Sequence, residues 1–112
     1  MNRILLIGNN REVDSMTIKI LRRNGYFAYL LGDTLVEKPN LIIIDCEMSP
    51  KEGFKKYQTI INNLFPTSIL WISSEEKDEI DALEYGADDW IKKPYHIEVL
   101  LARIKKLCKR SV

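Results

Sequence analysis

Short apolar runs alternate with segments of helical period along this chain. The apolar runs fall at residues 4–7, 26–31, 41–44, 68–72 and 90–91. Each run has the length of a buried strand, and most of the stretches between them carry apolar residues every three or four positions. This alternation is typical of βα units, which build a parallel sheet covered by helices on both faces.

Four segments between and after these runs predict helices. The first is capped by Asn10 and closed by Asn24-Gly25. Its expected apolar positions are Val13, Met16, Ile20 and Leu21. The second ends before Pro66 and has Phe54, Tyr57, Ile61 and Leu64 on one face. The third begins with acidic residues and ends at Gly86. The last has the cleanest amphipathic stripe, formed by Ile97, Leu100, Leu101, Ile104, Leu107 and Cys108.

The connection between the second and third runs is short. Residues 32–40 must carry the chain from one strand to the next in the same direction. A parallel crossover normally takes about a dozen residues or more, with a helix inside. We therefore expect the second crossover helix to be lost or vestigial.

Composition and charge narrow the class of protein. The chain has 112 residues, 46% of them hydrophobic, so residues 1–112 are expected to form one domain with a proper core. A net charge of +1 with interspersed acids and bases argues against a domain that binds nucleic acid by itself. The apolar runs are far shorter than a membrane span and no signal peptide is evident, so we expect a cytoplasmic protein without a membrane role. Cys46 and Cys108 are expected to be ordinary thiols.

Three of the strands are followed by polar side chains that suit a phosphoryl-acceptor site. Asp45 ends the third strand, Ser73 the fourth, and Lys93 follows the fifth. Ligands of an open parallel sheet bind outside the carboxyl ends of the strands, where these three groups should meet. Ser73-Ser74 is also an ordinary N-cap signal for the following helix, and a Ser–Lys hydrolase is disfavoured because no nucleophile elbow or oxyanion hole is recognisable.

These features resemble the response-regulator receiver domain of the CheY-like superfamily over essentially the whole chain. The resemblance rests on residues 41–45, on Gly53, and on the block Gly86-Ala87-Asp88-Asp89-Trp90-Ile91-Lys92-Lys93-Pro94-Tyr95. It implies a doubly wound, flavodoxin-like (βα)5 fold with strand order 2-1-3-4-5. It also implies that Asp45 is the phosphoacceptor, Ser73 the switch hydroxyl, Lys93 the amine before a cis-proline, and Trp90 the aromatic switch position. Without a working switch, Trp90 would be a packing residue.

The segment of residues 101–105 resembles the OmpR/PhoB-type subfamily, whose receivers precede a DNA-binding winged helix. The resemblance implies a homodimer through the fourth helix, the last strand and the last helix, with DNA bound only through a separate C-terminal domain. The matching charged positions are Asp88, Asp89, Arg103 and Arg110. The alternative is that they are solvated surface charges of little energetic value.

The chain departs from the family at its acidic pair, where Gly8 and Asn9 stand. Mg²⁺ prefers oxygen ligands that include carboxylates, and the ligands left here are Asp45, the Glu47 backbone carbonyl and Asn9. We therefore expect Mg²⁺ binding to be weak or absent, and no other cofactor. Arg11, as a cation, or Glu47, as a replacement carboxylate, would be the residues to compensate. His96 lacks Cys or His neighbours at ligand spacing and is expected to start a helix.

Two functions remain open. The first is an atypical pseudo-receiver, a regulatory and dimerisation domain of a DNA-binding regulator that works largely without phosphorylation, with Lys93 permanently paired to Asp45. The alternative is a conventional receiver that takes a phosphoryl group from a histidine kinase on Asp45. Retention of Asp45, Ser73 and Lys93 favours the alternative, whereas Gly8 and Asn9 favour the first. An enzyme with a diffusible substrate is disfavoured, because no cofactor fingerprint or catalytic dyad is present.

Overall fold

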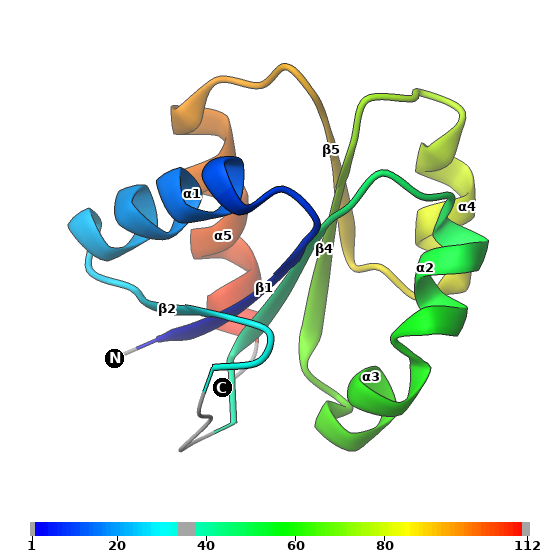
Figure 1. The fold of residues 1–112 in the computed structure, drawn as a ribbon, viewed down its shortest axis with the longest axis horizontal. Helices are drawn as coiled ribbons and strands as arrows, with labels where there is room; N and C mark the ends of the chain where they lie inside the picture. The colour runs from blue at the N-terminus through cyan, green and yellow to red at the C-terminus, as the bar shows by residue number, and fades with distance from the viewer. Residues whose placement is uncertain (1, 34–37, 111–112) are drawn as a thin grey trace.

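A five-stranded parallel sheet forms the centre of the molecule in the computed structural model, which describes residues 2–33 and 38–110 (Figure 1). The strands are β1 (Arg3–Gly8), β2 (Phe27–Leu30), β3 (Leu41–Asp45), β4 (Ser68–Ser73) and β5 (Asp89–Lys92). Their order is β2-β1-β3-β4-β5, and every neighbouring pair is parallel. The expected doubly wound α/β fold and strand order are thus confirmed.

Helices cover both faces of the sheet, as Figure 1 shows. The helices are α1 (Arg11–Arg23), α2 (Pro50–Lys56), α3 (Gln58–Leu64), α4 (Asp78–Tyr85) and α5 (Ile97–Arg110). One core cluster packs α1 and α5 against the sheet, and a second packs α2, α3 and α4 against the opposite face. Since side chains alternate along a strand, Leu41 and Ile43 face the first cluster and Ile42 and Ile44 the second, so all four are fully buried.

The helix α1 turns a different face to the core from the one that its apolar residues indicated. Its buried positions are Asp14, Thr17, Ile18 and Leu21. Val13 and Met16 are instead 40% and 64% exposed. The expectation for Val13 and Met16 was therefore wrong, because the helix is rotated so that an acid faces the first strand. The caps were placed correctly, since the Asn10 side chain accepts from the Val13 N–H and Asn24 is the C-cap.

The second expected helix is divided in two. Tyr57 ends α2 and caps α3, and its ring is buried in the second core cluster. Below α2, the indole of Trp71 is fully buried and stacks on Phe54 at 5.3 Å between ring centroids. A Cβ atom on Gly53 would overlap the Trp71 ring. A residue without a side chain is therefore what allows α2 to lie directly on the tryptophan.

The second crossover lies only partly within the described residues. On either side of the gap, residues 31–33 and 38–40 are not helical. The expected loss of the crossover helix also concerns residues 34–37, which lie outside the described residues. No helix in the described part of the chain is both long enough and apolar enough to cross a membrane.

Candidate functional site

The carboxyl ends of β1, β3 and β4 bring the expected site residues to one edge of the sheet. Gly8 and Asp45 are direct partners in the register of β1 and β3. Ser73 ends β4, beside Lys92 of β5. A cavity of about 530 Å³ opens at this edge, and Asp45, Glu47, Ser73, Ser74 and Lys93 are among the residues that line it.

Asp45 is held by Lys93 in a short ion pair. The Lys93 Nζ lies 2.5 Å from Asp45 Oδ1, and the exposed fractions of the two side chains are 33% and 5%. The loop that carries Lys93 is hydrogen-bonded to the end of β4, where the Lys93 backbone N–H donates to the Ser73 carbonyl at 2.9 Å. The peptide bond between Lys93 and Pro94 is cis, as the resemblance to the receiver family implied. The carboxylate is therefore buried with a cation against it and needs no further charge to be tolerated there.

Ser73 is engaged by the aromatic residue of the neighbouring strand. The Trp90 Nε1–H donates a 2.9 Å hydrogen bond to Ser73 Oγ. The alternative role of Ser73-Ser74 as an N-cap is wrong, because α4 begins at Asp78 with Lys77 as its cap residue. Ser73 instead ends β4 and lines the cavity together with Asp45 and Lys93.

Asp14 also lies near this edge of the sheet, against Gly8, and was not among the residues expected there. Its carboxylate is 6% exposed and occupies the space that a Cβ atom on Gly8 would fill. Burial raises the pKa of Asp14, the negative charge of Asp45 raises it further, and a hydrogen bond with the Asn10 backbone lowers it. Two features of the sequence could have indicated this position. Asp14 stands at helical spacing from Thr17, Ile18 and Leu21, and a glycine ends the first strand.

The donor set at this edge consists of oxygen atoms, which suits a hard cation such as Mg²⁺. Glu47 is exposed and lines the cavity with Asp45, and the exposed Asn9 follows Gly8, which is the register partner of Asp45. Among the described residues, no group of three or more His, Cys, Asp and Glu side chains is placed to hold a metal ion. A cation at this edge would therefore have few carboxylate ligands and would take its other ligands from backbone carbonyls and water.

Three of the four charged residues expected at a dimer face make hydrogen bonds within the chain. Arg103 Nη1 contacts both carboxylate oxygens of Asp89, at 2.9 and 2.8 Å. Asp88 Oδ2 accepts from the Ile69 N–H at 2.8 Å, where β4 begins. The helix α5 extends to Arg110, whose side chain lies outside the description. The backbone carbonyl of His96 accepts from the backbone N–H groups of Val99 and Leu100, so His96 precedes the first turn of α5 as expected.

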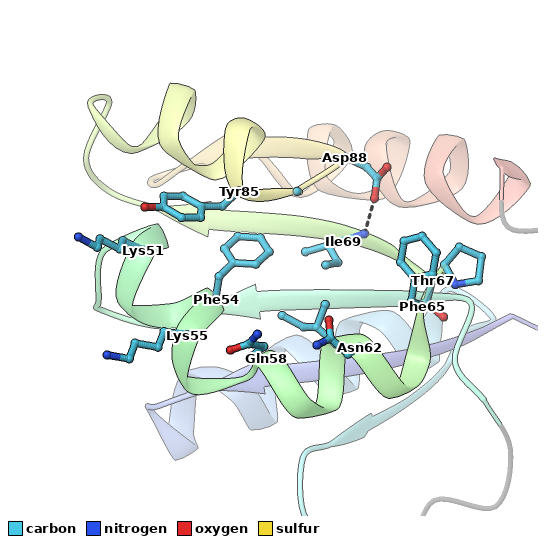
Figure 2. A pocket seen from close by; sticks show the side chains of 13 residues that line it. Lys51, Phe54, Lys55, Gln58, Asn62, Phe65, Thr67, Ile69, Tyr85 and Asp88 are labelled. Carbon is cyan, nitrogen blue, oxygen red and sulfur yellow. Dashed lines mark hydrogen bonds between the residues drawn. The ribbon is translucent and has the colours of Figure 1, made fainter.

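A larger cavity, of about 700 Å³, lies between α2, α3, α4 and the start of β4 (Figure 2). Phe54, Ile61 and Tyr85 give it apolar walls, and Lys51 and Lys55 lie at one end. Of the expected site residues it includes only Asp88, whose carboxylate is bound to the Ile69 N–H as drawn in Figure 2. Asp45, Ser73 and Lys93 line the smaller cavity and not this one.

Comparison with known proteins gives consistent matches. The sequence profile of the response regulator receiver domain matches residues 4–105. The chain is 33% identical over 123 residues to the uncharacterized transcriptional regulatory protein YvcP of Bacillus subtilis, covering 99% of this chain and 50% of that protein. It is 30% identical over 118 residues to the transcriptional regulatory protein CpxR of Escherichia coli, covering 99% and 51%. The chain thus spans about half the length of these curated relatives.

Among solved structures, a two-component response regulator from Clostridium difficile superposes with a TM-score of 0.80 at 24% identity, covering 98% of both chains. The chemotaxis response regulator CheY4 of Vibrio cholerae superposes with a TM-score of 0.77 at 21% identity, covering 96% of this chain and 98% of the other. At these identities the likeness concerns the fold.

Proposed function

The chain belongs to the response regulator receiver family, with relatives among transcriptional regulators, and from this premise we propose that it is an atypical receiver that regulates transcription largely without phosphorylation. In this proposal it is the regulatory and dimerisation domain of a DNA-binding regulator and not an enzyme. DNA is bound by a separate C-terminal domain, and the protein acts in the cytoplasm, where its promoters are.

The observation that carries the proposal is the ion pair between Lys93 and Asp45. It neutralises the acceptor carboxylate from within the chain. At the same edge, Ser73 already has a partner in Trp90. Phosphoryl transfer depends on positioning and on neutralising the charge of the transferred group, and the acidic pair that would hold a metal for that purpose is replaced by Gly8 and Asn9. An acceptor that is already paired, with few ligands for a cation, is suited to a fixed conformation.

The proposed homodimer uses the face formed by α4, β5 and α5. Exposed apolar side chains lie on the two helices, among them Ile80 at 66%, Leu83 at 44% and Val99 at 40% exposure. The pair of Asp89 and Arg103 sits between them on the strand and the last helix. A twofold interface of this kind would bury the apolar residues at its centre, with the charged groups setting the register.

A second candidate function is that of a conventional receiver that accepts a phosphoryl group from a histidine kinase. The observation that favours it is the cavity at Asp45, which Ser73, Ser74 and Lys93 also line. In such a transfer the bond between phosphorus and the donor histidine nitrogen breaks and a bond to a carboxylate oxygen of Asp45 forms. Lys93 and Ser73 would then bind the phosphoryl oxygens.

Intact-mass analysis distinguishes the two functions. The protein is incubated with acetyl phosphate and Mg²⁺, with Asp45→Ala as the control, and its oligomeric state is followed by light scattering. The proposal expects no adduct and a dimer that forms without the phosphodonor. A phosphoryl adduct that is lost in Asp45→Ala, together with dimerisation only after its formation, would establish the conventional receiver instead.

A further inference from the structure

We propose that the cavity of about 700 Å³ between α2, α3 and α4 binds a small amphipathic anion, a molecule with a flat apolar body and one anionic group such as a carboxylate or sulfonate. This cavity shares none of its lining residues with the smaller cavity at Asp45. The inference goes beyond the proposed function and does not depend on whether Asp45 is phosphorylated.

The first argument is a wall of stacked aromatic rings. The ring of Phe54 on α2 stacks on the buried Trp71 indole, with 5.3 Å between the centroids and 12° between the planes. The same ring stacks on that of Tyr85 on α4, with 6.0 Å between the centroids and 22° between the planes. Phe54 and Tyr85 both line the cavity. Aromatic faces pack well against another flat ring in an offset stack, so this wall suits a planar apolar ligand.

The second argument is the apolar surface that this cavity leaves in contact with water. Phe65 is 76% exposed and Tyr85 is 48% exposed, while Phe54 and Ile61 are partly buried. All four side chains line the cavity, and the buried Ile69 lines it as well. Pockets for small molecules have mostly apolar and aromatic walls and volumes of about 300–1,000 Å³. The cavity therefore has the size and the lining of a small-molecule site.

The third argument is the charge at one end of the cavity. Lys51 and Lys55 are four residues apart on α2 and lie together at that end (Figure 2). Within the part of the chain that the structure describes, neither ammonium group has an ion pair or a hydrogen bond. Asp88 is the one acid among the lining residues, and it lies away from the lysines, where its carboxylate accepts from the Ile69 N–H. A ligand would therefore place its anionic group at the two lysines and its apolar body along the rings.

The test uses two fluorescent dyes that differ by one charged group. Anilinonaphthalene sulfonate carries the anion, and phenylnaphthylamine has the same rings without it. Each dye is titrated into the folded protein at low ionic strength, and its site is mapped by the chemical-shift changes of the backbone amides. We expect both dyes to bind saturably at the cavity, with the sulfonate tighter by about threefold or more. Added salt should reduce this difference, because the lysines are exposed and their charges are screened.

Substitution of the lysines separates the charge from the apolar wall. Lys51→Gln combined with Lys55→Gln should weaken binding of the sulfonate by about threefold or more and leave the neutral dye unaffected. The matched control is Lys105→Gln combined with Lys106→Gln, which removes the same charge from two exposed positions of α5 that do not line the cavity. We expect the control to bind both dyes as the wild type does.

Substitution of the outer ring tests the apolar wall. Tyr85→Ala should weaken both dyes, and Phe27→Ala, which removes an exposed aromatic side chain of β2 outside the cavity, should weaken neither. Urea denaturation checks that each variant is folded. No saturable binding of the sulfonate, shift changes away from the cavity, or equal effects of a variant and its control would overturn the proposal. Equal affinity for the two dyes would also overturn it, because the occupant would then be a purely apolar one, such as a helix of a partner protein.

Discussion

The indole N–H of Trp90 donates a hydrogen bond of 2.9 Å to the hydroxyl oxygen of Ser73, across the pairing of β4 and β5. Trp90 lines a third cavity together with Val99 and Arg103 of α5, on the face proposed for dimerisation. A single hydrogen bond thus links the edge that carries Asp45 to the outer face of the domain. We therefore expect substitutions of Ser73 to change the environment of the Trp90 side chain at that face.

Ser73→Ala removes the acceptor of this hydrogen bond. We expect a loss of about 0.5–1.5 kcal/mol in the free energy of unfolding and a change in tryptophan fluorescence, because the half-buried indole loses its partner. Urea denaturation and emission spectra measure both quantities. Ser74→Ala, at the exposed neighbouring position, should leave both unchanged, and an equal effect of the two variants would show that the hydrogen bond is unimportant.

Lys93→Met leaves the Asp45 carboxylate buried without its cation. We expect the free energy of unfolding to fall by about 1–3 kcal/mol, since a buried charged group then lacks its partner. Asp45→Asn should partly rescue Lys93→Met, because the amide carries no charge to be compensated. Urea denaturation of the four proteins in this double-mutant cycle gives the coupling energy, and strict additivity would contradict a direct interaction.

Asp14 should make stability depend on pH. Burial raises the pKa of its carboxyl in the folded protein above the unfolded value, with the charge of Asp45 as the second cause. The folded state therefore binds this proton more tightly than the unfolded state, and the stability contributed by protonated Asp14 is lost as pH rises from about 3.9, the unfolded value, through the folded pKa.

Asp14→Asn removes this titration. We expect the variant to gain stability relative to the wild type as pH rises from about 4 to 7, with the largest gain at neutral pH. Urea denaturation across this range in a buffer without divalent cations measures the difference. A difference that is constant with pH, or that falls, would show that Asp14 does not carry the raised pKa.

Cys46 and Cys108 should be unreactive in the folded protein. Burial raises the pKa of each thiol to about 11. At pH 8 only about one thiol in a thousand is then ionised, and the thiolate is the reactive form. We expect no alkylation by iodoacetamide at pH 8 on the timescale on which both cysteines react in urea, as followed by intact mass. Rapid labelling of either cysteine under native conditions would contradict their burial.

Gly53→Ala should destabilise the protein by overpacking. The added methyl group would overlap the ring of Trp71, which is fully buried and cannot move aside without disturbing Phe54. The expected cost is about 1–3 kcal/mol, measured by urea denaturation. Gly53→Ala in combination with Trp71→Leu should lose less than the two single changes added together, since the smaller side chain leaves room for the methyl group.

Much of the architecture and part of the site could be predicted from the chain itself. Buried strands and amphipathic helices have distinct periods, and parallel strands end at one edge, so Asp45, Ser73 and Lys93 were expected together before any coordinates. The structure shows the pair of Asp45 and Lys93 and the cis peptide bond before Pro94. The meeting of Asp45 and Lys93 follows from the pattern and from the topology that it implies, whereas the cis peptide bond was expected from the resemblance to the receiver family.

Only the tertiary structure decided the rest. The rotation of α1 depends on how the whole helix packs, and a pattern of apolar residues favoured Val13 and Met16 over the face of Asp14. Asp14 lies against Gly8, and Trp90 is hydrogen-bonded to Ser73. Both contacts join residues on different elements, and the periodicity of a sequence does not give distances between elements. In the sequence, glycine at position 8 indicated that an acid had been lost. In the structure, the carboxylate of Asp14 occupies the space that a side chain at position 8 would fill.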